Sequence, residues 1–253
     1  MRGPLVDLSG RRVLITGAAG AIGSATARVC ADLGGQIILA GRNSTALEEL
    51  CHQLPGSGHV TSAFDLADQD GIPAWMRELA KENGAISAVA HCAGIELLLP
   101  VSRTSASTFR SVLDVNAGAA LALVRGLRTQ GTSAPPASIV FVASVMGVVG
   151  ESGQTIYSAS KGALIAMARS LAIELARYRL RVNCVAPGLV ESAMADRLCK
   201  TLPPDKKQAI RDLHPLGLGT PTQVANVIAF LLSEAASWVT GTTVIVDGGY
   251  TAH

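Results

Sequence analysis

The stretch Arg12-Val-Leu-Ile-Thr-Gly-Ala-Ala-Gly-Ala-Ile-Gly23 joins a short apolar run to a glycine-rich turn, and a helical pattern follows it through Leu33. Strand, glycine turn and helix in this order are the context in which a glycine motif binds a dinucleotide. Glycine lets the backbone approach the pyrophosphate, whose charge then lies at the N-terminus of the helix. The stretch therefore predicts the first strand–helix unit of a Rossmann-like sheet. The residues expected at the cofactor are Gly17, Gly20, Ala21, Ile22 and Gly23.

Further apolar runs have the length and composition of buried strands, and helical patterns separate them. They cover residues 36–40, 59–64, 85–90, 138–143, 180–186 and 242–249. Because strands and helices alternate throughout, we predict one α/β domain over residues 1–253, with a doubly wound, parallel, seven-stranded sheet and helices on both faces. Ligands of such sheets bind at the carboxyl ends of the strands. Gly17, Gly94, Ser144 and Gly188 follow strand ends, so they are expected at one edge.

Composition narrows the class of protein. Hydrophobic residues make up 49% of the chain and allow a substantial core, while aromatic residues make up only 4%. The net charge of +2, without a run of Lys or Arg, argues against nucleic-acid or anionic membrane partners. The apolar runs are shorter than the roughly 18 residues that span a bilayer, and residues 1–7 are too polar for a secretion signal. We expect a soluble, cytoplasmic protein.

The cysteines are odd in number and scattered, and no C-x-x-C pair occurs. The histidines do not supply a cluster of zinc ligands either, so no metal site is expected. Reduced, mostly buried thiols are typical of the cytoplasm. The cysteines are Cys30, Cys51, Cys92, Cys184 and Cys199.

A second motif, Tyr157-Ser-Ala-Ser-Lys161, opens a long apolar helical pattern. Positions i and i+4 share one face of a helix, so the phenol and the ammonium point the same way. Ser144 stands at the end of the predicted strand 138–143. A Tyr-x-x-x-Lys spacing alone is typical of any helix, but a hydroxyl, a phenol and an ammonium that converge at a strand end form an active-site arrangement.

These motifs, in this order, resemble the short-chain dehydrogenase/reductase family in its classical branch, and the resemblance covers essentially the whole chain. It implies that Tyr157 protonates a carbonyl oxygen, that Ser144 hydrogen-bonds this oxygen, and that Lys161 binds the nicotinamide ribose. An ammonium roughly 4 Å away at an effective dielectric constant of about 20 contributes about 4 kcal/mol, enough to bring the tyrosine pKa from about 10 toward about 7. The resemblance also places Asn116 behind the lysine, where it holds a relay water. We expect Asn116 inside one helix over residues 104–130.

The same resemblance assigns further residues to the cofactor. An aspartate after the third strand lies beside the adenine, although it could instead cap a helix beginning near Asp68. His91-Cys-Ala-Gly94 replaces the usual Asn-Asn-Ala-Gly, and we expect His91 to be a strand-end histidine with satisfied hydrogen bonds rather than a base. Residues 187–192 form the turn over the nicotinamide. The cofactor residues implied are Asp65, Leu66, Cys92, Ala93, Gly94, Tyr157, Lys161, Pro187, Gly188, Val190 and Ser192.

The choice of cofactor depends on Arg42. An acid about 20 residues beyond the glycine turn would bind the ribose diol of NAD, and the nearest one, Glu48, lies inside the next predicted helix. Arg42 is placed to meet a 2′-phosphate, although it could be a solvated loop residue. NADP is therefore favoured over NAD.

Three functions remain open. The first is an NADP(H)-dependent oxidoreductase that interconverts a ketone and a secondary alcohol, similar to 3-oxoacyl-acyl-carrier-protein reductase. The second is a nucleotide-sugar-modifying enzyme, because Gly17, Gly20 and Gly23 follow TGxxGxxG and Ala21 departs from TGxxxGxG. The third is a nucleotide-binding sensor or scaffold without catalysis, which the complete set of candidate catalytic residues disfavours.

The substrate is expected to be a small carbonyl compound or alcohol, and the sequence does not name it. A lid around residues 189–214 is expected to cover its pocket. We also expect a homo-oligomer, a tetramer or a dimer, because the helices at 104–130 and 154–178 are apolar around most of their circumference. The candidate pocket residues are Val145, Met146, Met194, Glu96 and Gln154.

Overall fold

A parallel sheet forms the centre of the molecule in the computed structural model, which describes residues 6–192, 203, 208–209 and 211–252. The sheet has seven strands in the order β3-β2-β1-β4-β5-β6-β7. All neighbouring strands pair in parallel. Their bounds are Arg12–Thr16 (β1), Gln36–Gly41 (β2), Val60–Ala63 (β3), Ile86–His91 (β4), Ser133–Val142 (β5), Leu180–Pro187 (β6) and Thr243–Val246 (β7). The order reverses between β1 and β4, so the predicted doubly wound sheet is confirmed.

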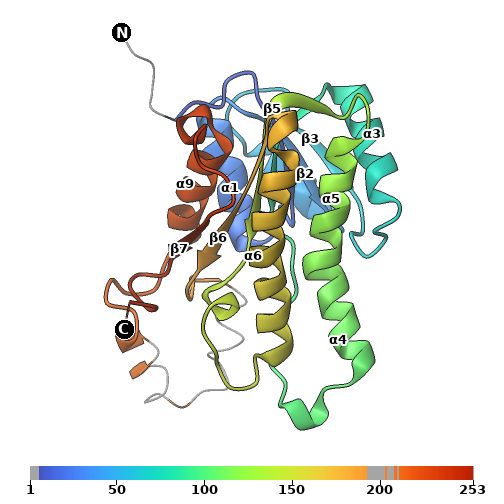
Figure 1. The fold of residues 1–253 in the computed structure, drawn as a ribbon. Coiled ribbons are helices and arrows are strands. Elements are labelled where there is room, and N and C mark those ends of the chain that lie inside the picture. Colours follow the sequence, from blue (N-terminus) through green and yellow to red (C-terminus); the bar gives the residue numbers. More distant parts are fainter. Residues whose placement is uncertain (1–5, 193–202, 204–207, 210, 253) are drawn as a thin grey trace.

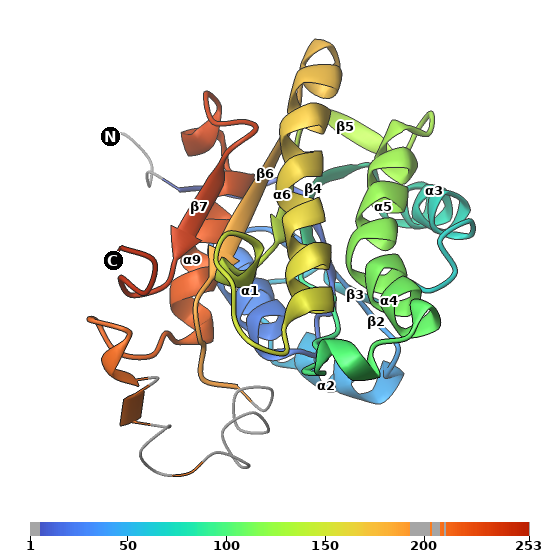
Figure 2. The same cartoon turned by 60° about the horizontal axis from the view of Figure 1, so that its bottom comes forward.

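Helices cover both faces of this sheet (Figures 1 and 2). One face carries α1 (Ala21–Asp32), α2 (Ser44–His52) and α9 (Pro221–Leu232), and the other carries α3 (Ile72–Asn83), α5 (Ala119–Arg128) and α6 (Thr155–Leu175). Along β1, Leu14 belongs to the core on the α3, α5 and α6 side, whereas Val13 and Ile15 belong to the core on the other side. This alternation along a strand fills two separate cores with one run of apolar residues.

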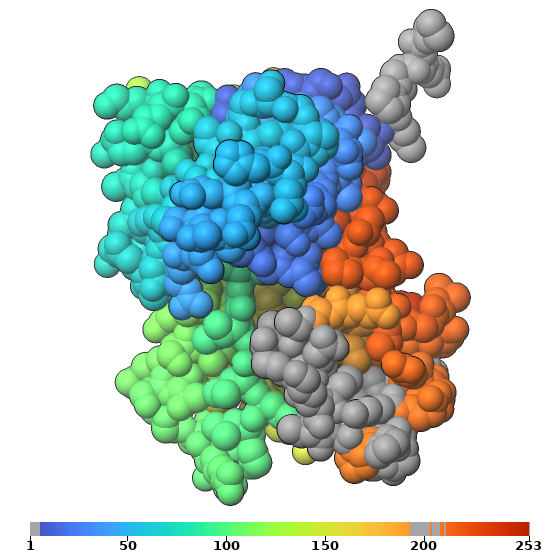
Figure 3. Space-filling view, turned by 180° about the vertical axis from the view of Figure 1, so that it is seen from behind, coloured from blue at the N-terminus to red at the C-terminus, as the bar shows by residue number. Residues whose placement is uncertain are grey.

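Viewed from behind, the blue N-terminal part of the chain covers much of the upper surface (Figure 3). The orange and red C-terminal part lies beside it.

Small residues allow close packing where large side chains are few. At Gly126 of α5, for example, a Cβ would lie 2.4 Å from Sδ of Met76 on α3, so a larger residue there would force the Met76 side chain to move.

The helix predicted over residues 104–130 is interrupted, which corrects the sequence-based expectation. The structure has α4 (Ala106–Leu113), a π-helical turn over Asp114–Gly118 and then α5. Asn116 lies in this turn, and its side chain bonds to the backbone of another segment. A π-turn within an α-helix is frequent at functional sites.

Two helix starts test the capping predictions. Helix α9 begins as predicted, because Thr220 accepts a hydrogen bond from the N–H of Gln223 and the Gln223 side chain accepts one from the N–H of Thr220. Helix α3 begins at Ile72, later than the expected start near Asp68, and Asp68 accepts a hydrogen bond from Gly71 before it.

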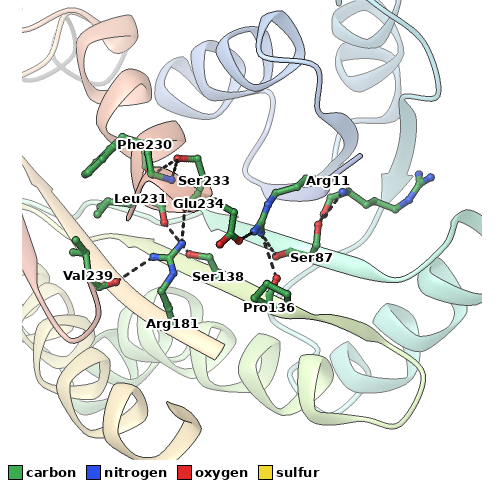
Figure 4. Close-up of polar contacts among 12 residues, drawn as sticks. Arg11, Ser87, Pro136, Ser138, Arg181, Phe230, Leu231, Ser233, Glu234 and Val239 are labelled. Carbon is green, nitrogen blue, oxygen red and sulfur yellow. Dashed lines mark hydrogen bonds and ion pairs between the residues drawn. The ribbon is translucent and has the colours of Figure 1, made fainter. Parts of the chain in front are cut away.

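The amino ends of the strands are fastened by two arginines (Figure 4). Arg11 donates to the carbonyl of Pro136 and pairs with Glu234. Arg181 donates to the carbonyl of Val239 at 3.1 Å, and burial lowers its pKa. These charges hold the loops at the edge that lies opposite the carboxyl ends of the strands.

None of the helices in the described part of the chain is both long and apolar enough to cross a membrane. The cysteines that can be placed there are free thiols, and Cys199 lies outside the described residues. These thiols are Cys30, Cys51, Cys92 and Cys184.

Candidate active site

The glycine turn after β1 is shaped by close backbone contacts. Gly17 has φ +63°, and a Cβ there would lie 2.7 Å from Cα of Ala93. A Cβ on Gly23 would lie 2.2 Å from the carbonyl oxygen of Gly17. Gly20 caps α1 without a side-chain hydrogen bond, so no side chain of this cap satisfies the N–H groups of the first helical turn. Bare N–H groups at a helix N-terminus fit the pyrophosphate of a dinucleotide.

Ala21, the residue that departs from the usual glycine pattern, is the first residue of α1. A helical residue accepts a methyl group without strain, and Gly20 and Gly23 line the turn on either side of it. The shape of the turn is therefore compatible with the TGxxGxxG spacing.

His91 ends β4 and is fully buried. Its Nδ1 lies 2.9 Å from Oγ1 of Thr16, and its Nε2 lies 3.3 Å from the main-chain carbonyl oxygen of Asn116. A carbonyl oxygen can only accept, so Nε2 carries the proton and Nδ1 accepts from the threonine hydroxyl. Burial, with the charge of Lys161, lowers the pKa of His91 to about 4. The expectation of a neutral strand-end histidine with both nitrogens satisfied is confirmed.

Asn116 is buried, as predicted, and its side chain binds the segment that follows β4. Its Oδ1 accepts from the N–H of Ile95 at 2.8 Å, and its Nδ2 donates to the carbonyl of Ile95 and to Oγ of Ser160, each at 2.9 Å. The side chain thus holds residues after β4 against α6. Its role in holding a relay water stays a prediction.

Ser144, Tyr157 and Lys161 converge at the end of β5. The Ser144 hydroxyl forms a hydrogen bond with the Tyr157 phenol and accepts one from the N–H of Met146 at 3.1 Å. Nζ of Lys161 donates to the carbonyl oxygen of Val142 at 2.8 Å and lies 5.5 Å from the centre of the Tyr157 ring. The predicted meeting of a hydroxyl, a phenol and an ammonium is therefore present.

Gly94 lies beside Asn116 and Lys161. A Cβ on Gly94 would lie 3.2 Å from Oδ1 of Asn116 and 3.3 Å from Nζ of Lys161. Any side chain at this position would crowd both residues, so glycine keeps the approach to them open.

Burial controls the protonation of the phenol and the amine. It raises the pKa of Tyr157 to about 12, with a further upward contribution from the charge of Glu96, while the hydrogen bond from Ser144 acts in the opposite direction. Burial also lowers the pKa of Lys161 to about 8. The expectation that Lys161 brings the tyrosine pKa toward 7 is wrong for this arrangement, because the desolvation of the phenolate exceeds the effect of an ammonium bound to Val142.

The residues predicted around the adenine lie at the ends of β2 and β3. Arg42 is exposed directly after β2, and no ion pair involves it among the described residues. Asp65 is exposed after β3, and its Oδ1 accepts from the N–H of Ala67 at 3.1 Å. This bond caps a turn rather than α3, so the helix-capping alternative for Asp65 is wrong. Leu66 beside it is buried.

The turn after β6 is packed against the C-terminal segment. A Cβ on Gly188 would lie 2.9 Å from Cα of Asp247, Val190 forms an isolated bridge with Gly219, and Oγ of Ser192 donates to the carbonyl of Val190 at 3.1 Å. Most of the lid predicted around residues 189–214 lies outside the described residues, as does Met194.

Two contributors to this edge escaped the sequence-based prediction. Thr16 orients His91, and its position at a strand end beside the glycine turn was an available signal. His214 accepts a hydrogen bond from the N–H of Leu189 at 3.3 Å and stacks on Tyr250. Nothing in the local sequence around His214 indicates this contact.

Ser144, the partly buried Tyr157 and Lys161 meet at the carboxyl edge of a Rossmann-like sheet, an arrangement that fits a dinucleotide-dependent oxidoreductase. A family model described as enoyl-(acyl carrier protein) reductase matches residues 17–251. The chain belongs to the short-chain dehydrogenase/reductase family, which acts on CH–OH and carbonyl groups. Membership implies dependence on NAD or NADP.

Relatives extend over nearly the whole chain. The cis-4-hydroxycyclohexanecarboxylate dehydrogenase of Sinomonas cyclohexanicum is 35% identical and aligns with 96% of this chain and 97% of its own length. The 3-oxoacyl-acyl-carrier-protein reductase FabG of Rickettsia conorii is 35% identical, with coverages of 97% and 98%. The crystal structure of a short-chain alcohol dehydrogenase from Sinorhizobium meliloti 1021, described as putative, has a TM-score of 0.91 at 28% identity, with coverages of 98% and 99%.

Proposed function

We propose that the protein is a cytoplasmic NADP(H)-dependent oxidoreductase that interconverts a ketone and a secondary alcohol, with an activity similar to that of 3-oxoacyl-acyl-carrier-protein reductase. The observation that supports this best is the convergence of Ser144, Tyr157 and Lys161 beside Asn116, where the strands end. The FabG relative supports the reductive activity, and the free thiols support a cytoplasmic location.

The cofactor would be held along the carboxyl edge of the sheet. The glycine turn would bind the pyrophosphate through the N–H groups that begin α1. Lys161 would bind the nicotinamide ribose, and Arg42 would bind the 2′-phosphate. The bound reduced nicotinamide supplies the hydride. The residues assigned to the remaining contacts are Asp65, Leu66, Cys92, Ala93, Gly94, Pro187, Gly188, Val190 and Ser192.

Side chains of the protein donate the proton to the carbonyl oxygen and stabilise the phenolate that forms. A phenol with a pKa of about 12 is protonated at neutral pH, so Tyr157 holds the proton that a carbonyl oxygen accepts during reduction. Ser144 holds the same oxygen through its hydroxyl. Lys161 is mostly protonated below its pKa of about 8, and its charge stabilises the developing phenolate.

NADP is preferred to NAD because of the end of β2. An exposed arginine without an ion pair among the described residues is free to meet a 2′-phosphate, and a charge-assisted bond of this kind is strong. No acidic side chain stands at the end of this strand to accept bonds from a ribose diol.

The nucleotide-sugar alternative rests on the glycine spacing alone, and the relatives above carry the names of dehydrogenases and reductases. Family membership excludes the non-catalytic scaffold as the leading interpretation.

We also propose that the protein assembles as a homo-oligomer, a tetramer or a dimer. Exposed apolar side chains on α6 and near β7, namely Ile173, Trp238 and Ile245, support an interface.

The test is oxidation of NADPH, followed by absorbance, over a panel of ketones, cyclic ketones and 3-oxoacyl thioesters. We expect turnover of at least one carbonyl class, with NADPH used more efficiently than NADH. Failure to turn over any carbonyl or secondary alcohol with either cofactor, by enzyme that binds NADPH, would contradict the proposed function.

A further inference from the structure

Three consecutive residues after β4 contact the candidate catalytic residues or their neighbours. Gly94 faces Lys161 and Asn116, as its Cβ distances show, and the backbone of Ile95 is bonded on both sides to the Asn116 side chain. The next residue, Glu96, accepts a hydrogen bond from Nε2 of Gln154 at 2.9 Å. Glu96 is therefore fixed beside the start of α6, one helical turn before Tyr157.

Gln154 is almost completely buried, and its orientation is set by the carboxylate. A carboxylate only accepts hydrogen bonds, so the amide must turn its NH₂ toward Glu96. The amide oxygen Oε1 is then left buried without a hydrogen-bond partner among the described residues. A buried acceptor without a donor is costly, and because this oxygen has almost no accessible surface, a ligand donor meets the Glu96 carboxylate instead.

The Glu96 carboxylate can accept more hydrogen bonds than the one from Gln154. An ionised carboxylate accepts up to about four hydrogen bonds, and within the described structure Gln154 is the side chain that donates to it. Glu96 is partly exposed, so its carboxylate is the acceptor open to a ligand, and the buried Gln154 amide holds that carboxylate in place. We call these two residues the Glu96–Gln154 pair.

This pair lies within electrostatic reach of the reacting groups. The charge of Glu96 raises the pKa of both Tyr157 and Lys161. A substrate whose carbonyl oxygen accepts from Tyr157 therefore has its nearest substituents in the field of this carboxylate. A substrate carboxylate there would be repelled by Glu96. A substrate ammonium would be attracted by Glu96 and repelled by Lys161, so the two effects oppose each other. A neutral hydroxyl donates to the carboxylate and is repelled by neither charge.

We propose that the Glu96–Gln154 pair selects substrates with a hydroxyl group on the carbon next to the reacting carbonyl, so that the preferred class is an α-hydroxy ketone and its vicinal diol. The proposal rests on the proposed ketone–alcohol activity and narrows its substrate class. The hydroxyl hydrogen is donated to the pair while the neighbouring carbonyl oxygen accepts from Tyr157 and Ser144.

Three probes of matched shape test the proposal. They are 1-hydroxyhexan-2-one, heptan-3-one, in which a methyl group replaces the hydroxyl, and 2-oxohexanoate, in which a carboxylate lies beside the carbonyl. We expect kcat/KM with NADPH to be roughly ten- to a hundred-fold higher for the hydroxy ketone than for heptan-3-one, because a hydroxyl donates to a charged acceptor. The oxo acid is expected to be the poorest of the three.

Variants separate recognition from folding. Glu96→Gln removes the charge but keeps the size, and Gln154→Leu removes the amide. Each variant is expected to lower the ratio of kcat/KM for the hydroxy ketone to kcat/KM for heptan-3-one toward one. Glu96→Gln is also expected to raise kcat/KM for the oxo acid. Glu78→Gln on the exposed face of α3 is the control and should keep the wild-type ratio. Thermal unfolding shows whether each variant is folded.

Reduction of heptan-3-one as efficient as that of the hydroxy ketone, with a ratio unchanged in Glu96→Gln, would overturn this proposal and leave the proposed function intact. Calorimetric binding of the hydroxy ketone and heptan-3-one to the protein saturated with NADP⁺ is the second readout. Equal affinities of the wild-type protein for the two ketones would also overturn the proposal. This readout needs no variant, so it decides the question even if a variant fails to fold. Turnover of none of the ketones, including the wider panel, would instead contradict the proposed function itself.

Discussion

The imidazole Nε2 of His91 lies 3.3 Å from the main-chain carbonyl oxygen of Asn116, and this contact joins the end of β4 to the π-helical turn. On its other side the same ring accepts from Thr16, whose hydroxyl oxygen in turn accepts from the N–H of Ala93 at 3.4 Å. One neutral side chain thus connects the first strand, the central strand and the turn that carries Asn116. It occupies the position where the family resemblance calls for asparagine.

The His91 contact predicts sensitivity to acid. Its pKa is lowered to about 4 in the folded protein, so the contribution of the neutral ring is complete above the ordinary value near 6.5 and is lost as the pH falls toward 4. On going from pH 7 to pH 5, this one group should remove on the order of 2 kcal/mol from the free energy of unfolding. Urea unfolding at both pH values measures the loss.

His91→Asn should remove that part of the loss, because an amide donates to the Asn116 carbonyl without titrating. The exposed His52 on α2 provides the control, and His52→Asn should keep the wild-type acid sensitivity. Equal losses in wild type and His91→Asn would show that His91 is not the titrating group.

The lowered pKa of Lys161 predicts the alkaline side of the pH–rate profile. Its pKa of about 8 lies below the ordinary lysine value, so its charge is present at pH 7 and disappears as the pH rises through about 8. Tyr157, with a pKa of about 12, stays protonated over this range. We expect kcat/KM for carbonyl reduction to be level near pH 7 and to fall by up to tenfold per unit above pH 8. A level profile up to pH 9.5 would contradict this assignment.

Arg42 predicts the choice of cofactor. Arg42→Ala should weaken NADP binding by roughly ten- to a hundred-fold, because a charge-assisted bond to a phosphate is lost. Adding Gly41→Asp should reverse the preference toward NAD. The structure tolerates this side chain, since a Cβ on Gly41 would meet Leu47 at an ordinary 3.5 Å.

The measurement is the ratio of kcat/KM for the two cofactors in wild type and in the double variant. Arg77→Ala, on the exposed surface of α3, is the control and should leave the ratio unchanged. A wild-type preference for NAD would mean that Arg42 is a solvated loop residue.

The exposed apolar residues predict association. Ile173 is 83% exposed on α6, and Trp238 is 98% exposed before β7. Sedimentation equilibrium at micromolar concentration should show a tetramer or a dimer. A stable monomer at that concentration would refute the homo-oligomer.

Sequence patterns predicted the parts of this protein that depend on spacing. The strand and helix order follows from alternating apolar runs, and the shared face of Tyr157 and Lys161 follows from the helical repeat. The π-helical turn could not be predicted, because Asn116 is held by Ile95 and Ser160, whose proximity exists only in the folded chain. The pKa of Tyr157 was predicted in the wrong direction for the same reason, since spacing gives the neighbouring charge but not the burial.

In the proposed reaction, Tyr157 donates the proton to the carbonyl oxygen. Tyr157→Phe removes the donor and keeps the ring, so the packing against Lys161 should persist. The most direct test is kcat for carbonyl reduction by this variant at saturating substrate, with NADPH affinity measured by fluorescence titration on the same preparation. We expect a loss of roughly 10²–10⁴-fold in kcat, with NADPH affinity within a few-fold of wild type. A variant that binds NADPH normally and retains a substantial fraction of the wild-type kcat would contradict this role of Tyr157.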